Sequence, residues 1–276
     1  MEELERNGCL YVDYDPSLRK GVEEAVAAWK AFCALPEEKK MAFEYDGDMN
    51  VSGNGYELKK GEQGQDFKEN VHLRVAARDE LLASAAEAHP VIGPEFVETA
   101  LALNPLMAPL LRSFAVEVEG ELGMEGFEAD VMERQSSWLL RFLHYFGGRK
   151  PGEVLAAPHG DKGGFTLHLY ESHAGVERLT FDTEEWVPMD LPHGKTVIFP
   201  GMGLQNRAKC RLRAPYHRVV ATEETADTGR WSAVCFFNFR NGRHFNKRQH
   251  GSQQSQPLAF NYHMQFDQFD DLFVDG

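Results

Sequence analysis

The chain has 276 residues, a hydrophobic fraction of 42% and a formal net charge of −14 at pH 7, which suits a globular protein with an ordinary packed core in one large domain or two small ones. The acidic balance argues against a nucleic-acid partner, because phosphate-backbone binding needs a basic stripe. No basic segment precedes an apolar run at the N-terminus, no apolar run is long enough to span a bilayer, and the four cysteines form no CxxC pair, so we expect a cytoplasmic protein without a membrane span.

Two helical stretches are predicted in the first half of the chain. From Pro16 to about Phe43, apolar residues recur at helical spacing, which predicts an amphipathic helix. A second helical stretch covers roughly Pro94 to Leu122, where two prolines predict a kink or a break after Asn104. Residues 46–65 lie between them and are rich in Gly, Asn and Asp, which predicts a loop or an irregular edge.

After about Trp138 the sequence changes to short runs of β-branched and aromatic residues separated by turn residues. These runs are WLLRFLHYF, FTLHLY, VERLTF, TVIFPG, YHRVVAT and WSAVCFFNF. They predict a β-sandwich or barrel, and so an α+β fold in which a helical N-terminal half packs against the β core. We expect a helical region over residues 1–125, a β core over 126–240, and a tail over 241–276 whose segment KRQHGSQQSQ is a candidate lid.

The stretch PHGDKGGFTLHLYES places His159 and Asp161 two residues apart, ahead of two glycines and an apolar strand. On their own, these two residues are explained equally well by a surface turn. His217, in APYHRVV, lies inside an apolar strand, where a core histidine is the other interpretation. Two imidazoles and one carboxylate on one face of a metal are the ligand set of non-haem Fe(II) oxygenases, which makes these three residues candidate ligands.

The strand GRWSAVCFFNF places Arg230 and Ser232 on one face, since side chains alternate along a strand. A guanidinium that points into a barrel needs an anion, and an arginine fork beside a hydroxyl suits a carboxylate. We expect this partner to be a ligand and not a group of the protein. Val234 and Phe236 continue the same face, which predicts an apolar pocket with one polar end.

The motifs HGD, HRVV and RWS, in this order, resemble the isopenicillin-N-synthase-like family of Fe(II)- and 2-oxoglutarate-dependent dioxygenases. The strand LRFLHYF, the segment HGKTVIFPGMGLQNRA and the N-terminal FCALPEEKKMAF are also similar to that family, so the resemblance runs from about Asn7 to Phe239. The chain departs from the family at Gly160, where a threonine is usual, and in the longer turn TEETADTG after His217.

The resemblance implies a double-stranded β-helix, or jelly roll, as the catalytic core. It implies an Fe(II) site with the ligands His159, Asp161 and His217. It also implies a site for the co-substrate 2-oxoglutarate, with Arg230 on the distal carboxylate and Ser232 and Tyr145 as hydrogen-bond donors. With O2 as the oxidant, the implied reaction hydroxylates a small-molecule substrate and releases succinate and CO2; desaturation and ring closure share its first step.

Four residues are expected to line the substrate pocket: Arg141, Leu143, His168 and Phe236. Arg141 and Leu143 share the face of Tyr145 by the period of a strand, whereas His168 is expected to face either the substrate or the solvent. His144 falls on the opposite face and is expected to be structural. The acidic composition favours a neutral or cationic substrate, and a monomer is the default expectation.

Three other functions are compatible with parts of this pattern. An Fe(II) oxidase of the same fold would use the Arg-x-Ser pair for the substrate's own carboxylate and consume no 2-oxoglutarate. A metal-dependent hydrolase would hold Zn2+ with the same three ligands but would leave Arg230 and Ser232 without a role. A jelly-roll binding protein without activity would keep the ligands and release no succinate.

Overall fold

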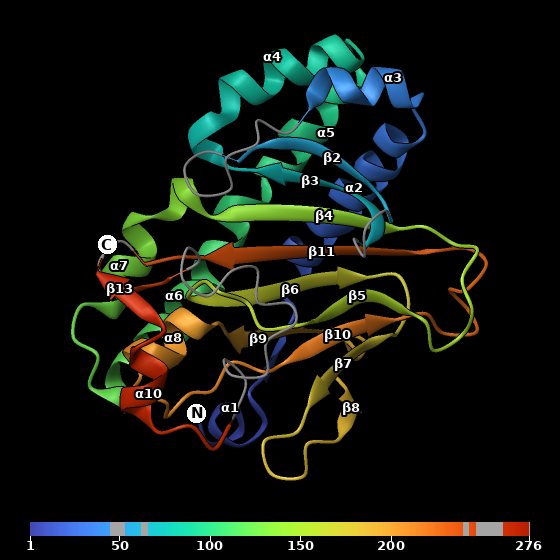
Figure 1. The fold of residues 1–276 in the computed structure, drawn as a ribbon. Coiled ribbons are helices and arrows are strands. Elements are labelled where there is room, and N and C mark those ends of the chain that lie inside the picture. The colour runs from blue at the N-terminus through green and yellow to red at the C-terminus, as the bar shows by residue number, and fades with distance from the viewer. Residues whose placement is uncertain (45–52, 62–65, 240–242, 247–261, 276) are drawn as a thin grey trace.

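The structure, a computed structural model, describes residues 1–44, 53–61, 66–239, 243–246 and 262–275. A layer of helices covers one face of a large antiparallel sheet, and a smaller sheet packs on the other face (Figure 1). The active-site residues predicted from the sequence lie between the two sheets. The following elements build this sandwich.

The larger sheet has seven strands, in the order β1 (Leu10–Asp13), β9 (Lys195–Pro200), β6 (Phe165–Glu171), β11 (Arg230–Phe237), β4 (Leu139–Tyr145), β3 (Phe67–Leu73) and β2 (Gly55–Lys60). The smaller sheet has four, in the order β5 (Val154–His159), β10 (His217–Val220), β7 (Val176–Leu179) and β8 (Trp186–Pro188). A two-stranded sheet joins β12 (Arg243–Phe245) to β13 (Phe273–Asp275).

The helices of the N-terminal region are α1 (Glu2–Asn7), α2 (Pro16–Cys33), α3 (Glu37–Lys40), α4 (Arg78–Ala88), α5 (Ile92–Leu101), α6 (Leu103–Leu122) and α7 (Phe127–Glu133). Two short helices follow later among the described residues, α8 (Met202–Arg207) and α10 (Phe266–Asp270). Single 3-10 turns lie at η1 (Met41–Phe43), η3 (Val75–Ala77) and η4 (Gln135–Ser137).

Helix α2 is shorter than the sequence predicted. Asp15 caps its start, because its side chain accepts hydrogen bonds from the backbone N–H groups of Ser17 and Leu18. The helix ends at Cys33 and does not continue to Phe43. The reason is Pro36, which lacks an N–H and disfavours the helical conformation of the residue before it.

The predicted break in the second helical stretch is confirmed, but it lies between α5 and α6 at Ala102 and not after Asn104. The stretch Ile92–Leu122 contains an 18-residue segment whose length and mean hydropathy, 1.2, are those of a membrane-spanning helix. In the structure, 44% of that segment is buried. Core helices meet the same criterion. Here α5 and α6 contribute Phe96, Met107 and Phe114 to the core, so their apolar residues are explained by packing.

Residues 55–60 were predicted as a loop or an irregular edge, and this prediction is wrong for them. They form β2, which pairs with β3 and places the hairpin at the end of the large sheet beside β4. In the sequence GYELKK, Tyr56 and Leu58 alternate with Glu57 and Lys59 and pack into the core under the helices, but this apolar signal is too short to stand out in a stretch rich in turn residues. The N-terminal region therefore adds three strands to the large sheet besides its helices.

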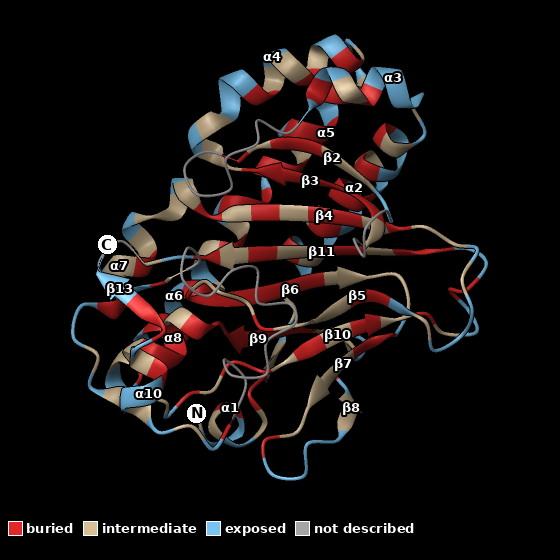
Figure 2. Ribbon diagram, viewed as in Figure 1, coloured by how far each residue is buried: buried red, intermediate tan, exposed pale blue. Residues whose placement is uncertain are grey.

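The central strands of the large sheet are largely buried (Figure 2), and two hydrophobic clusters lie on its opposite faces. The cluster under the helices contains Trp29 and Phe142, together with Ala233 and Cys235 of β11. The cluster between the sheets contains Leu143, with Val234 packed against it. The predicted alternation of β11 is thus confirmed, and its inner face belongs to the space between the sheets.

The C-terminal tail packs over one end of the sandwich. A third cluster joins Met202 of α8 to Phe245, Phe269 and Phe273 of the tail. The predicted lid segment, residues 247–256, lies outside the described residues.

Candidate active site

The structure brings the three predicted metal ligands together between neighbouring strands of the smaller sheet. His159 ends β5 and His217 begins β10, and the two residues are direct cross-strand partners. Their imidazole centroids lie 4.4 Å apart. One ligand atom from each histidine and one from Asp161 all lie within 4.8 Å of one another. Residues distant in the sequence thus form one compact donor set.

Both imidazoles are oriented so that Nε2, the ring nitrogen farther from the backbone, faces the other two candidate ligands. Nδ1 of His159 donates to the carbonyl of Ala157 at 2.7 Å, and Nδ1 of His217 donates to the carbonyl of Pro215 at 3.1 Å. The lone pair is then on Nε2, which in His159 lies 3.8 Å from Oδ1 of Asp161. Burial, with the neighbouring His217, lowers the pKa of His159 to about 4. A neutral imidazole in this orientation is the form that binds a metal, so the residues fit Fe(II).

Asp161 is held in place from both its side chain and its backbone. The hydroxyl of Thr166, in β6, donates a hydrogen bond to Oδ2 of Asp161. The backbone carbonyl of Asp161 accepts from the N–H of Met202, at the start of α8, at 2.7 Å. These bonds leave Oδ1 facing the histidines, as a metal ligand requires.

The glycines after Asp161 are needed because three backbone segments meet there. A Cβ on Gly201 would lie 2.3 Å from the carbonyl oxygen of Gly163. A Cβ on Gly164 would lie 2.7 Å from the Phe239 ring and 2.8 Å from the carbonyl oxygen of Phe237. Such distances are far below van der Waals contact, so the loop that carries Asp161 keeps its position only with glycine at these sites.

The predicted carboxylate anchor lies on the inner face of the large sheet. Arg230 begins β11 and is the cross-strand partner of Tyr145 in β4, while Ser232 is the partner of Leu143. The side chain of Arg230 is only 1% exposed. The structure therefore places Arg230, Ser232 and Tyr145 together, as the family resemblance implied.

Arg230 has a partner within the protein, which corrects the expectation that only a ligand would pair with it. Its Nη2 donates to Oε2 of Glu171 at 2.5 Å, and its Nε donates to the carbonyl of His173 at 3.1 Å. Burial raises the pKa of the Glu171 carboxyl, against the opposing effect of Arg230. The anchor is thus a buried ion pair before any co-substrate binds.

A β-bulge explains why the sequence did not reveal Glu171. In β6, His168 pairs with Val234, but Tyr170 and not Leu169 pairs with Ala233, so one extra residue is inserted. Strict alternation from His168 would put Glu171 on the outer face. The extra residue turns it back to the inner face, opposite Ser232.

His168 faces the interior and not the solvent. It is 3% exposed, its Nε2 donates to the carbonyl of Tyr170 at 3.1 Å, and the same atom lies 3.2 Å from the Ser232 hydroxyl. Burial and the nearby Arg230 lower the pKa of His168 to about 3, so the ring is neutral at pH 7. His168 therefore supports the anchor at Ser232.

The other predicted pocket residues lie on β4 and β11 of the large sheet. The Arg141 guanidinium lies over the Phe236 ring, 4.9 Å from its centroid, and Leu143 is buried between the sheets. Nε of Arg141 also donates to Nε2 of His72 at 2.6 Å. His72 belongs to β3, a strand that the sequence analysis did not assign to the site.

Strand β3 supplies a polar wall that the sequence analysis missed. Its inner-face residues are all buried and pair with Tyr145, Leu143 and Arg141 in turn: Lys68, Asn70 and His72. Nζ of Lys68 bonds to Asp66 at 2.6 Å and lies 5.4 Å from the centroid of the Tyr145 ring. The available signal was the alternation in FKENVHL, in which every second residue is polar.

Comparison with known proteins agrees with this geometry. Residues 138–239 match the family model described as the 2OG-Fe(II) oxygenase superfamily. A 2-oxoglutarate-dependent dioxygenase of Didymella fabae is 32% identical over 104 residues, which are 36% of this chain and 31% of that protein, so the match spans about a third of this relative. The 2-oxoglutarate-Fe(II) type oxidoreductase hxnY of Emericella nidulans is 24% identical over 256 residues, 86% of this chain and 72% of that protein.

A solved structure confirms the fold. A full-length protein of Neurospora crassa, solved in complex with alpha-KG and 5-formyluracil, has a TM-score of 0.72 at 19% identity, over 99% of this chain and 84% of that chain. The double-stranded β-helix predicted from the resemblance is therefore confirmed. Residues 138–239, which carry the three candidate metal ligands and the Arg230–Ser232 pair, are thus similar to the 2OG-Fe(II) oxygenase superfamily, and the chain shares the fold of the Neurospora crassa protein.

Proposed function

We propose that this Fe(II)- and 2-oxoglutarate-dependent oxygenase hydroxylates a small molecule, with release of succinate and CO2. The observation that carries the proposal is the placement of the His159–Asp161–His217 centre and the Arg230–Ser232 anchor in the space between the two sheets. A metal centre and a carboxylate anchor on facing sheets suit a co-substrate that is a 2-oxo acid at one end and a carboxylate at the other.

The three ligands would hold Fe(II) and leave positions for the 2-oxo acid and O2. Bound iron supplies the redox chemistry by which O2 oxidises first the co-substrate and then the substrate. The protein orients its ligands through the carbonyls of Ala157 and Pro215 and through the Thr166 hydroxyl. These contacts fix which ring nitrogen and which carboxylate oxygen are available.

Arg230 and Ser232 are assigned to the distal carboxylate of 2-oxoglutarate. Nε and Nη2 of Arg230 are bonded to His173 and Glu171, so Nη1 is the donor that we assign to the co-substrate. The hydroxyl of Ser232 is held by His168 on the same face. Tyr145, opposite Arg230 on β4, lies next to this group and is the third assigned contact.

The substrate is proposed to be a small molecule with hydrogen-bonding groups. The wall offers apolar contact at Leu143 and Phe236 and polar groups at Lys68, Asn70 and His72. These buried side chains guide the substrate proposal better than the net charge of the chain, because substrate meets the wall and not the whole surface. The Neurospora crassa relative was solved with 5-formyluracil, a small molecule, in support of this substrate size.

An anaerobic titration of the Fe(II)-loaded protein with 2-oxoglutarate tests the proposal. Chelation of iron by a 2-oxo acid gives a weak visible charge-transfer band, so we expect a saturable band. Arg230→Ala should weaken 2-oxoglutarate binding far more than iron binding, and His217→Ala should lose iron. Arg211→Ala is the matched control, because Arg211 is 54% exposed and pairs with Glu5 outside the site.

Succinate release across a panel of small molecules then identifies the substrate. Bound iron without a visible band at saturating 2-oxoglutarate would contradict the assignment of the anchor and would favour an oxidase that binds the substrate's own carboxylate. A normal iron affinity in the His217 variant would contradict the assignment of the metal centre.

A further inference from the structure

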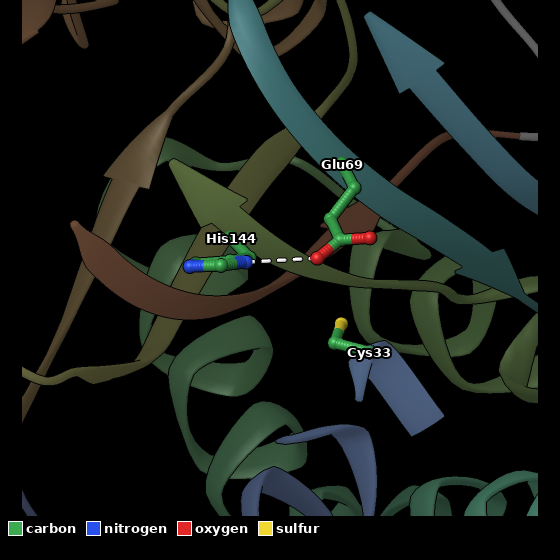
Figure 3. A group of neighbouring side chains, drawn as sticks. All are labelled: Cys33, Glu69 and His144. Carbon is green, nitrogen blue, oxygen red and sulfur yellow. Dashed lines mark hydrogen bonds and ion pairs between the residues drawn. The ribbon is translucent and has the colours of Figure 1, made fainter. Parts of the chain in front are cut away.

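A second group of metal-ligating side chains lies on the outer face of the large sheet, opposite the active site. It consists of Cys33 at the end of α2, Glu69 in β3 and His144 in β4 (Figure 3). One sulfur, nitrogen or oxygen atom from each lies within 4.8 Å of the other two. His144 lies on the face opposite Tyr145, as predicted, but the reaction proposed above uses none of these three side chains.

We propose that Cys33, Glu69 and His144 form a second metal site that takes Zn2+. A thiolate, an imidazole nitrogen and a carboxylate oxygen are all zinc ligands, and a water molecule would complete the tetrahedron. The His159–Asp161–His217 centre contains no sulfur, and a thiolate favours Zn2+ over harder ions such as Mg2+. The two sites therefore differ in their ligand chemistry.

The carboxylate of Glu69 is already oriented for this role. Its Oε2 accepts hydrogen bonds from Nζ of Lys40 at 2.5 Å and from the hydroxyl of Tyr56 at 2.7 Å. Its Oε1 lies 2.8 Å from Nδ1 of His144. Burial alone would raise the pKa of Glu69, but the hydrogen bonds from His144, Lys40 and Tyr56 hold it at about 2. Ligating carboxylates in proteins are fixed by outer hydrogen bonds of this kind.

The imidazole of His144 is fixed as well. Its ring stacks on the Trp231 ring with centroids 3.6 Å apart and an interplanar angle of 1°. In this orientation Nδ1 points at Glu69, towards the side of the cluster where Cys33 lies (Figure 3). Metal bonds of about 2.0–2.3 Å separate tetrahedral ligand atoms by about 3.3–3.8 Å. The observed spacings, 2.8 Å between Nδ1 of His144 and Oε1 of Glu69 and at most 4.8 Å among the three ligand atoms, lie on either side of this range, so metal binding would require the side chains to rotate.

The charges around the cluster are compatible with a divalent ion. Without metal, Lys40 balances Glu69, and burial together with Glu69 raises the pKa of the Cys33 thiol well above its usual value. Metal binding breaks the S–H bond, forms the sulfur–metal bond and releases the proton to solvent. The thiolate, the carboxylate and the Lys40 ammonium then sum to one negative charge, the same as the catalytic triad.

The position of the cluster indicates what the metal would do. It would join the end of α2 to β3 and β4, behind Trp231, which stands between Arg230 and Ser232 on β11. Cys33 and His144 are only partly buried, so the cluster is not sealed from solvent. The metal would therefore tie the helical layer to β3 and β4, next to the strand that carries the co-substrate anchor, and should raise the melting temperature.

Cobalt(II) titration of the iron-free full chain tests this site. Cobalt bound to a thiolate gives an intense near-ultraviolet charge-transfer band, whereas cobalt bound only by His159, Asp161 and His217 gives none. We expect two Co2+ ions per chain and a thiolate band in the wild type. Cys33→Ser should bind one Co2+ and lose the band, and Zn2+ added to the wild type should displace the cobalt that produces it.

Two further variants separate this site from the active site. His217→Ala should lose the other Co2+ and keep the thiolate band, so failure of the catalytic assignment would be seen independently. His144→Gln should weaken the band-forming cobalt at least tenfold, and it provides the test if Cys33→Ser does not fold by circular dichroism.

The matched control is Cys210→Ser, since Cys210 is also a half-buried free thiol and should keep the band. Absence of the band in the folded wild type, its persistence in Cys33→Ser or its loss in Cys210→Ser would overturn the proposal. Each result decides whether the cluster is a metal site or only a buried hydrogen-bonded network.

Discussion

Arg230 and Glu171 form an ion pair with an Nη2–Oε2 distance of 2.5 Å, and their side chains are only 1% and 6% exposed. The guanidinium assigned to the co-substrate is therefore shared with a carboxylate of the same chain. A second carboxylate that enters this space meets both the attraction of Arg230 and the repulsion of Glu171. We therefore predict that the pair sets the affinity for 2-oxoglutarate as well as the conformation of the anchor.

Glu171→Gln should bind 2-oxoglutarate about tenfold more tightly, or ~1.4 kcal/mol. The amide keeps the shape of the side chain but removes the negative charge that competes for Arg230. The same change should lower the free energy of unfolding of the protein without co-substrate by about 3 kcal/mol, because it leaves a buried guanidinium without its counter-charge. Titration by the visible band and urea unfolding measure the two effects.

Glu177→Gln is the control for this variant, since Glu177 pairs with Arg218 at 2.7 Å in the smaller sheet and is a quarter exposed. It should leave the affinity for 2-oxoglutarate unchanged. Equal or weaker binding in Glu171→Gln would show that Glu171 orients Arg230 and does not compete with the co-substrate.

Thr166→Val should weaken Fe(II) binding by about tenfold to a hundredfold, the range seen when an outer hydrogen bond to a metal ligand is removed. The valine is close to threonine in shape but cannot donate to Oδ2 of Asp161. Competition with a chromophoric chelator measures the affinity. Thr180→Val is the control, because the Thr180 hydroxyl bonds to Thr183 on the surface; an unchanged affinity in Thr166→Val would contradict the role assigned to this bond.

Gly201→Ala should destabilise the protein by about 1–3 kcal/mol and weaken iron binding. The added methyl would lie 2.3 Å from the carbonyl of Gly163 and 3.0 Å from that of Asp161, so the loop of the metal ligand must move. Gly120→Ala, in α6, meets nothing within 4 Å and should stabilise the protein by about 0.5–1 kcal/mol. Urea unfolding and iron titration measure the stability and the iron affinity of both variants. Equal changes in the two variants would refute the steric argument.

Glu69 should make the protein sensitive to acid. Its folded pKa of about 2 lies below the ordinary value of 4.5, so its ionised form stabilises the fold above pH 4.5, and this contribution is lost as the pH falls towards 2. The gap corresponds to about 3 kcal/mol. Glu69→Gln should lose this amount at pH 7 and show a flatter stability profile between pH 4.5 and 2.

Urea unfolding at several pH values, with a chelator present, measures that profile. Glu98→Gln is the control, since Glu98 is 59% exposed beside Arg78 and should leave the profile unchanged. If the free energy of unfolding of Glu69→Gln fell with pH as steeply as that of the wild type, other carboxyl groups would govern acid unfolding.

The grouping of the three candidate metal ligands, and of Arg230 with Ser232, was predictable because few side chains perform the chemistry assigned to them. Two histidines and one carboxylate, as in His159, Asp161 and His217, are the ligand set of non-haem Fe(II) sites. Arg230 and Ser232 suit a carboxylate and lie on a strand with clear alternation of its side chains. The main strands were predictable for a similar reason, since β-branched and aromatic runs bounded by turns indicate strands in a core.

The missed features depend on pairings that a single sequence does not contain. Glu171 reaches the anchor only through a bulge in β6, and β3 resembles a polar segment because its polar residues face the space between the sheets. Cys33 lies next to Glu69 and His144 only after α2 packs on the sheet. Long-range register and packing decide these contacts, and apart from the alternation in β3 local periodicity carries no signal for them.

The pairing of β1 with β9 has a consequence for how the chain is made. Leu10 is the partner of Ile198, so β1 must wait for almost two hundred further residues to be synthesised before it can join the sheet. Folding should therefore be slow, since contacts between distant segments pay the entropy of closing a long loop. Until β9 is made, the apolar face of β1 has no native strand to cover it, and the nascent chain is at its most vulnerable to aggregation.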